Sequence, residues 1–236
     1  VTEVLIAGAP SNINWIDEVE ATLESTGLVS ADTYYLQSGT PTLSELNAYD
    51  AILVFTDTNA TNPTLFGDNL AQYLEAGGGV VDATFHPNVP GAQGNFSQYM
   101  LYIGGAQSQP GNVQIGAVYD SSHPIMNGVS SFNGGTASYH NSGGSVATGA
   151  SVVADNSVGE PFIIVNDNVG PANAKRAFLN FYPPSDSSRS DFWVSTTDGA
   201  LLMANALTWV GGPPPPTGPT LDYTFCSEEM PLEFNP

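Results

Sequence analysis

Three histidines are the residues of this chain best suited to acid–base or metal chemistry. His86 follows the apolar run Val80–Phe85, so it stands at the carboxyl end of an expected strand, where open α/β sheets hold their ligands. An imidazole there could act as a general base or a metal ligand, or it could simply hydrogen-bond to loop backbone. His123 and His140 show no H-x-x-x-H spacing, which argues against a zinc site. We therefore assign no catalytic residue and keep His86 as the candidate.

Nucleophiles are not arranged in a recognisable pattern. Cys226 is the single cysteine, which excludes a disulfide within the chain and a Cys-rich zinc site. There is no G-x-S-x-G motif for a serine nucleophile. The glycines at 77–79 follow an expected helix and precede a strand, so they predict a helix C-cap rather than a phosphate-binding loop.

Oxygen ligands for a hard cation are concentrated in two short segments, Asp155-Asn156-Ser157 and Asn166-Asp167-Asn168. Asp155 and Asp167 are therefore candidate calcium ligands, although such segments are more often plain turns. We expect no other cofactor. Asn59 and Asn95 each begin an N-x-S/T sequon and could carry glycans.

The charge balance is strongly acidic. Against 23 acidic residues stand only three cations, which gives a net charge of −20 over 236 residues. Such a chain cannot neutralise phosphates, so we expect no nucleic acid and no anionic membrane as partner, and no apolar run approaches the roughly 20 residues of a membrane span. Strong acidity suits an extracellular or cell-surface protein. Because the chain begins at Val1 rather than Met, we expect a mature secreted protein after removal of a signal peptide.

Strands and helices alternate through the first ninety residues. The expected strands are Thr2–Ala9, Val29–Leu36, Asp50–Asp57 and Val80–Phe85, and the expected helices begin at Asn12 or Asn14, at Pro41 and at Asn62. This order predicts an α/β, flavodoxin-like sheet that is mostly parallel, with helices on both faces.

The second half of the chain is richer in strands. The expected strands are Val113–Tyr119, Ser151–Ala154, Pro161–Val165 and Ala174–Tyr182, preceded by a short helix within Gly91–Gly105. A last helix, capped by Asp198, ends at Gly211-Gly212. We expect Lys175-Arg176 to begin a strand and to offset nearby carboxylates. The globular domain is thus predicted to span residues 1–211.

A proline-rich spacer, residues 212–219, separates this domain from an extended tail, residues 220–236. Apolar residues in the tail alternate as in a strand, and we expect them to dock on a protein surface. The expected docking residues are Leu221, Tyr223, Phe225, Leu232 and Phe234. The surface could belong to the same domain or to a neighbouring copy.

Several segments together resemble a known family. They are Tyr49-Asp50-Ala-Ile-Leu-Val-Phe55, Leu70–Val81, His123-Pro-Ile-Met-Asn-Gly-Val-Ser-Ser-Phe132, Gly159-Glu-Pro161, Lys175-Arg176 and Leu201–Trp209. In this order they resemble the trehalose-utilisation-like (ThuA-like) branch of the class I glutamine-amidotransferase-like fold, over residues 1–211. The resemblance implies an amidotransferase-like domain.

The resemblance also implies where catalysis would occur. Amidotransferase relatives carry a nucleophilic cysteine in a tight turn after the strand equivalent to Val80–Phe85. This chain reads Ala83-Thr84-Phe85-His86-Pro87 there, without a cysteine. Cysteine-dependent amide hydrolysis is therefore not expected. ThuA-like members often carry a histidine where His86 stands.

Two functions remain open. The first is a non-catalytic extracellular structural or interaction protein, a self-assembling surface or fibre subunit whose tail docks on a neighbouring copy. The alternative is a secreted module that binds or processes carbohydrate in the crevice near His86, which the family resemblance implies. Trp15 and Trp193 could stack on sugars, although their spacing is typical of core residues.

Overall fold

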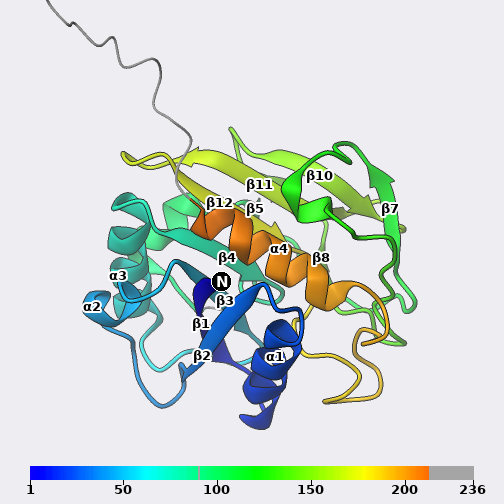
Figure 1. The fold of residues 1–236 in the computed structure, drawn as a ribbon, viewed down its shortest axis with the longest axis horizontal. Helices are drawn as coiled ribbons and strands as arrows, with labels where there is room; N and C mark the ends of the chain where they lie inside the picture. The colour runs from blue at the N-terminus through cyan, green and yellow to red at the C-terminus, as the bar shows by residue number, and fades with distance from the viewer. Residues whose placement is uncertain (90, 213–236) are drawn as a thin grey trace, which may run out of the picture.

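An eight-stranded mixed sheet runs through the computed structural model, which describes residues 1–89 and 91–212 (Figure 1). Its strands are β1 (Thr2–Ala9), β2 (Val29–Tyr35), β3 (Ala51–Thr56), β4 (Gly79–Ala83), β7 (Ile115–Val118), β10 (Ser151–Asn156), β11 (Pro161–Val169) and β12 (Ala174–Leu179). The order is β2-β1-β3-β4-β12-β11-β10-β7. The first five strands are parallel and the last three are added antiparallel, so the predicted mostly parallel sheet and β-rich second half are confirmed.

Helices cover both faces of this sheet. They are α1 (Asn14–Glu24), α2 (Leu43–Leu46), α3 (Pro63–Glu75) and α4 (Gly199–Gly211), with 3₁₀ turns η1 (Gly94–Tyr99) and η2 (Pro124–Met126). Helices α1 and α4 pack on one face, and α3 and η1 on the other. Two small sheets lie beside the main one, formed by β5 (Tyr102–Ile103) with β9 (Ser145–Val146) and by β6 (Ala106–Ser108) with β8 (His140–Ser142).

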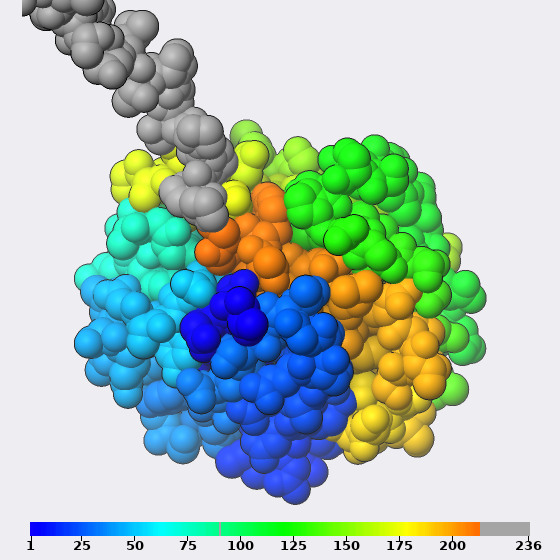
Figure 2. All heavy atoms as spheres, in the orientation of Figure 1, coloured from blue at the N-terminus to red at the C-terminus, as the bar shows by residue number. Residues whose placement is uncertain are grey.

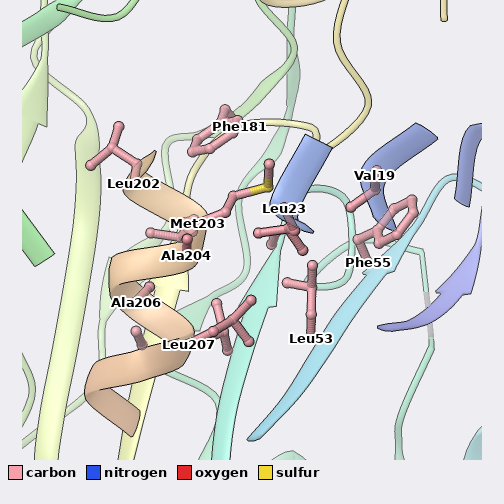
Figure 3. Packing of buried hydrophobic residues seen from close by; sticks show 14 of the residues in the cluster. Val19, Leu23, Leu53, Phe55, Phe181, Leu202, Met203, Ala204, Ala206 and Leu207 are labelled. Carbon is pink, nitrogen blue, oxygen red and sulfur yellow. The ribbon is translucent and has the colours of Figure 1, made fainter. Parts of the chain in front are cut away.

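Strand β3 shows how the sequence divides the two faces. Successive side chains of a strand point to opposite sides. Leu53 and Phe55 accordingly join the core under α1 and α4, whereas Ile52 and Val54 join the core under α3. Figure 3 shows the first of these cores, in which Leu207 of α4 lies beside Leu53. All residues of β3 are buried, as expected for a central parallel strand.

Helix α3 begins and ends as its sequence predicts. The side chain of Asn62 accepts a hydrogen bond from the backbone N–H of Leu65 at 3.0 Å, and Pro63 occupies the first turn. Gly77 follows the helix with φ +104°, a conformation that favours glycine. The backbone N–H of Gly77 then donates to the carbonyl of Leu74 at 2.9 Å, which confirms the predicted glycine cap.

The predicted cap of α1 is wrong, and the predicted cap of α4 is at the right residue but lacks its side-chain hydrogen bond, for the same physical reason. Helix α1 has Ile13 at its N-cap with no side-chain cap, while the Asn12 side chain accepts from the N–H of Asn14 in the preceding turn. Asp198 does occupy the N-cap of α4, but its carboxylate accepts instead from the N–H groups of Ser130 and Ser131 at 2.8 and 2.7 Å. In both places a competing local or tertiary donor takes the capping oxygen.

Several element bounds also differ from those predicted. Strand β4 ends at Ala83 rather than Phe85, and the helix expected over Pro41–Tyr49 is the single turn α2. No helix within residues 1–89 and 91–212 is both long and apolar enough to cross a membrane. The spacer from residue 213 and the tail 220–236, with the predicted docking residues Leu221, Tyr223, Phe225, Leu232 and Phe234, lie outside the described residues.

Candidate functional site

His86 lies in the protein interior beneath η1. Only 3% of the residue is exposed, and its ring packs 6.0 Å from that of Phe96. Nε2 lies 3.0 Å from the backbone nitrogen of Ala92 and 3.2 Å from its carbonyl oxygen, and Nδ1 faces a carboxylate oxygen of Asp82 at 3.3 Å. Both ring nitrogens are thus occupied by protein groups. This geometry gives His86 a structural role in tethering the loop after β4.

Asp82 joins His86 to a buried cation. Its second carboxylate oxygen accepts from the guanidinium of Arg176 on the neighbouring strand β12, and both side chains are fully buried. Arg176 also donates to the carbonyl of Tyr99 at 2.6 Å and lies 4.4 Å from the ring centroid of Phe96. Burial opposes ionisation of Asp82, but Arg176 and His86 outweigh it and hold the pKa of that carboxyl below its usual value. The sequence predicted that Arg176 offsets a nearby carboxylate, and the structure shows that this carboxylate is Asp82.

An open crevice of about 210 Å³ lies on the other side of the loop after β4, at the carboxyl ends of the parallel strands. Phe85 lines this crevice, whereas the neighbouring His86 points away from it, toward Phe96. Its lining residues are Asp57, Phe85, Val89, Gln107, Tyr139, Tyr182, Arg189 and Phe192. They follow β3, β4 and β12 or belong to the segments around β6 and β8. The sheet topology alone brings them together.

Asp57 is the acidic group of this crevice. It follows β3 directly, and its backbone N–H donates to the carbonyl of Ala9 at the end of β1 at 3.1 Å. One carboxylate oxygen accepts from the Ser11 hydroxyl at 2.9 Å, and the other is buried near the Tyr182 hydroxyl without a hydrogen bond of normal geometry in the described structure. Partial burial raises the pKa of the Asp57 carboxyl, against the opposing influence of Ser11 and Tyr182.

The Tyr182 hydroxyl is the second polar group that lacks a partner. Tyr182 is 3% exposed, and its oxygen is buried without a hydrogen bond of normal geometry within the described residues. Burial first, and then the nearby Asp57 carboxyl, raise the pKa of the Tyr182 phenol, so it stays protonated and can donate. A buried hydroxyl without a partner costs free energy, about 1–3 kcal/mol. A ligand in the crevice could offset that cost at both Tyr182 and Asp57.

Arg189 supplies the cation of the crevice and is held in a fixed position. Its guanidinium donates to both carboxylate oxygens of Asp191 at 2.5 and 2.8 Å and to the Tyr139 hydroxyl at 2.5 Å. It lies 4.3 Å from the ring centroid of Phe192 and 5.7 Å from that of Trp15. These partners raise the pKa of Arg189 above its already high value, the Asp191 hydrogen bond contributing most. The guanidinium of Arg189 is therefore held in place at the crevice, and its positive charge is already balanced by Asp191.

A buried amide network supports the strand ends behind the crevice. The Asn180 side chain accepts from the backbone N–H of Asn141 at 2.7 Å and donates to the carbonyls of Asn141 and Pro161 at 2.9 and 2.7 Å. The hydroxyl of Thr84 lies 3.1 Å from the side-chain oxygens of both asparagines. This network ties β12 to the β8 and β11 segments, and so fixes the lining residues that follow β4 and β12.

The other predicted site residues lie elsewhere and apart. His140 is buried, with Nδ1 2.9 Å from the carbonyl of Ser138, and His123 packs on the ring of Trp209 at 4.8 Å. Asp155 accepts from the Tyr119 hydroxyl at 2.5 Å, and Asp167 lies in a separate depression with Asp120 and His123. Across residues 1–89 and 91–212 no three His, Cys, Asp or Glu side chains are grouped to hold a metal ion. The sequon residues Asn59 and Asn95 are both exposed.

Comparison with known proteins identifies the fold. No protein-family model matches the chain, and no curated protein matches it. Solved structures do match. A protein from Bacteroides uniformis described as ThuA-like superposes with a TM-score of 0.63 at 18% identity, covering 89% of this chain and 91% of that one. A second, from Parabacteroides merdae, gives 0.61 at 16% identity, covering 89% and 90%.

The chain has the ThuA-like fold. The mmIFT52 N-terminal domain is also similar, with a TM-score of 0.52 and 11% identity over 89% of this chain and 97% of that one. The family resemblance expected from the sequence is thus confirmed at the level of the fold. Within this ThuA-like fold the turn after β4 carries Thr84, Phe85 and His86 and no cysteine. At these identities function has to be argued from the crevice itself.

The sequence reasoning missed Asp57, Tyr139, Tyr182 and Arg189. One signal was available for Asp57, which ends a predicted central strand next to the point where the strand order reverses, between β1 and β3. No such signal marks Tyr182 or Arg189, because they become neighbours of Asp57 only through contacts more than 100 residues apart in the sequence.

Proposed function

We propose that this protein binds a small, neutral, hydroxylated ligand of the carbohydrate class in the crevice beside Asp57. The supporting observation is the acceptor and donor pair of Asp57 Oδ1 and the Tyr182 hydroxyl, two neighbouring buried atoms that make no hydrogen bond of normal geometry within the described residues, at a crevice of about 210 Å³. One is an acceptor and the other a donor, which are the two roles that a sugar hydroxyl fills at once.

Aromatic rings supply the other half of such a site. Phe85 stacks on Tyr182 with ring centroids 5.4 Å apart, and Tyr139 and Phe192 extend the aromatic wall. The C–H faces of a sugar ring pack on such surfaces while the hydroxyls meet polar groups at the edge. Gln107 adds an exposed side-chain amide that can both donate and accept.

The charge and the size of the crevice restrict the class of ligand further. Arg189 is already matched by Asp191, and Asp57 would repel a second carboxylate, so an anionic ligand finds no unmatched cation in the crevice. Drug-sized ligands generally occupy about 300 Å³ or more, so the crevice suits a single ring or the end of a longer glycan. The crevice next to the loop of His86 thus supports the carbohydrate interpretation, with the imidazole itself outside the binding surface.

The test is calorimetric titration of the full chain with a panel of neutral mono- and disaccharides. At least one sugar should bind, and Tyr182→Phe and Asp57→Asn should weaken that binding about tenfold each, the loss expected for one hydrogen bond to a buried partner. Tyr119→Phe and Asp155→Asn are the matched controls, because this tyrosine–aspartate pair lies outside the crevice. Failure of every sugar to bind, or equal affinity in all four variants, would contradict the proposal.

A further inference from the structure

A second and larger groove lies beside the outer face of α4, and it shares no lining residue with the crevice. This α4 groove has a volume of about 750 Å³ and lies between α4, the segment after α1 and the turn η2. Its apolar and charged lining comprises Leu28, Pro124, Lys175, Leu201, Trp209 and Gly212. In Figure 2 the surface of α4 (orange) is visible between the N-terminal part of the chain (blue) and the green segment that contains η2.

The wall of the groove is partly apolar and uncovered. Leu28 is 37% exposed, and Trp209 is half-buried with one ring edge packed by His123. Trp209 shares the outer side of α4 with the groove residues Asn205 and Thr208, while the opposite side of the helix fills the core. An exposed apolar surface of this kind, rimmed by polar groups, is typical of a protein interaction site.

The groove also holds a cation in a chain that has only three. Arg176 is paired with Asp82 and Arg189 with Asp191, both away from the groove. Lys175 has no ion pair within the described residues and lies 5.7 Å from the ring centroid of Trp209. In a chain of net charge −20, Lys175 gives the groove a cation that can attract an acidic apolar peptide.

The chain itself contains such a peptide. Residues 220–236 alternate apolar side chains at Leu221, Tyr223 and Phe225, and they carry four acidic residues with no Lys or Arg. The segment follows the predicted spacer, residues 212–219, whose first residue, Gly212, lines the groove. Five of the seven residues 213–219 are proline, a composition typical of a stiff spacer. Such a composition favours docking of the following apolar residues on a neighbouring copy over a return to the adjacent groove.

We propose that the α4 groove binds residues 220–236 of a second copy of this chain. Groove and tail are different surfaces, so the contact is heterologous: each copy offers one groove and one tail, and repetition produces a filament unless a ring closes. The α4 groove would thus be the surface to which the tail of a fibre subunit binds. This proposal is independent of ligand binding in the crevice.

The test uses the full-length chain in a complementation experiment. The groove variants are Lys175→Glu and Leu28→Glu, the tail variant is Tyr223→Asp, and Val158→Glu is a matched control on an exposed residue outside the groove. Masses are measured by light scattering over a hundredfold concentration range, with a reductant present because Cys226 lies in the tail. Circular dichroism checks that each variant is folded.

The wild type and Val158→Glu should form concentration-dependent oligomers, and each groove or tail variant alone should associate at least tenfold more weakly. Mixing Lys175→Glu with Tyr223→Asp should then restore a dimer and nothing larger, because one intact tail meets one intact groove. A wild type that stays monomeric at every concentration would overturn the proposal, as would oligomers unaffected by the groove and tail variants or a mixture that yields no dimer.

Discussion

Replacing Asp82 by asparagine would leave the Arg176 guanidinium buried without a counter-charge. In the native structure this cation is fully buried, and its remaining contacts are the Tyr99 carbonyl and the face of Phe96. Removing one partner of a buried ion pair costs about 3–5 kcal/mol, a large part of the 5–15 kcal/mol that holds a typical domain folded. We therefore expect Asp82→Asn to lose about 3–5 kcal/mol of unfolding free energy.

The comparison that makes this reasoning testable is the double variant Asp82→Leu with Arg176→Met. Because it removes both charges, it should be much closer to the wild type than Asp82→Asn is. Urea unfolding followed by tryptophan fluorescence gives the free energies, with Asp155→Asn as the control for an aspartate outside the core pair. A loss below about 1 kcal/mol in Asp82→Asn, or an equal loss in the double variant, would refute the account of this pair.

The same pair sets a pH dependence. The folded pKa of Asp82 lies below its ordinary value of 3.8, since Arg176 and His86 outweigh the burial that opposes ionisation. Its contribution is therefore complete above the unfolded pKa and is lost as the pH falls through the lower, folded value. Wild-type stability should fall more steeply below pH 4 than that of the double variant.

Three further predictions follow from single side chains. Asp57→Asn should raise the melting temperature near neutral pH while weakening ligand binding. Burial raises the pKa of the Asp57 carboxyl, and a carboxyl whose pKa is raised by folding makes the folded state less stable as the pH rises through that pKa. An unchanged or lower melting temperature in differential scanning fluorimetry would contradict this. His86→Ala should lower stability by about 2–3 kcal/mol in urea unfolding yet leave sugar affinity unchanged, because its imidazole lies outside the crevice; a selective loss of affinity would instead make His86 part of the site. Gly67→Ala should destabilise the fold by at least about 2 kcal/mol by the same assay, since a Cβ there would lie 1.7 Å from the carbonyl oxygen of Gln93, and a neutral result would mean that α3 and η1 can separate.

Local patterns were enough to predict most of the fold. The strand β3 and helix α3 follow from an apolar run, a 3.6-residue periodicity and an Asn–Pro start. Strand alternation does not explain why Phe85 lines the crevice and His86 faces Phe96, because β4 ends at Ala83 and both residues lie in the turn that follows. The sequence pattern therefore could not predict which of the two side chains faces the crevice.

The chemistry of the crevice depends on tertiary contacts instead. Nothing in the sequence distinguishes Asp57 from other aspartates at strand ends; its environment is made by Tyr182, which follows β12, and Ser11, which follows β1. Arg176 could be expected to meet a carboxylate, but its partner Asp82 is 94 residues away in the chain and is fixed only by the pairing of β12 with β4. The sequence correctly places Asp198 at the N-cap of α4, but its carboxylate accepts hydrogen bonds from donors 67 and 68 residues away rather than from the helix.

The central claim, that the crevice beside Asp57 binds a neutral sugar, is tested most directly by NMR mapping on the ¹⁵N-labelled full chain. Titration with the tightest-binding sugar should shift the side-chain signals of Arg189 and Gln107 together with the backbone amides around Asp57 and Tyr182, and leave Lys175 and Trp209 unchanged. Shifts that cluster in the α4 groove, or no shifts with any sugar at millimolar concentration, would contradict the assignment.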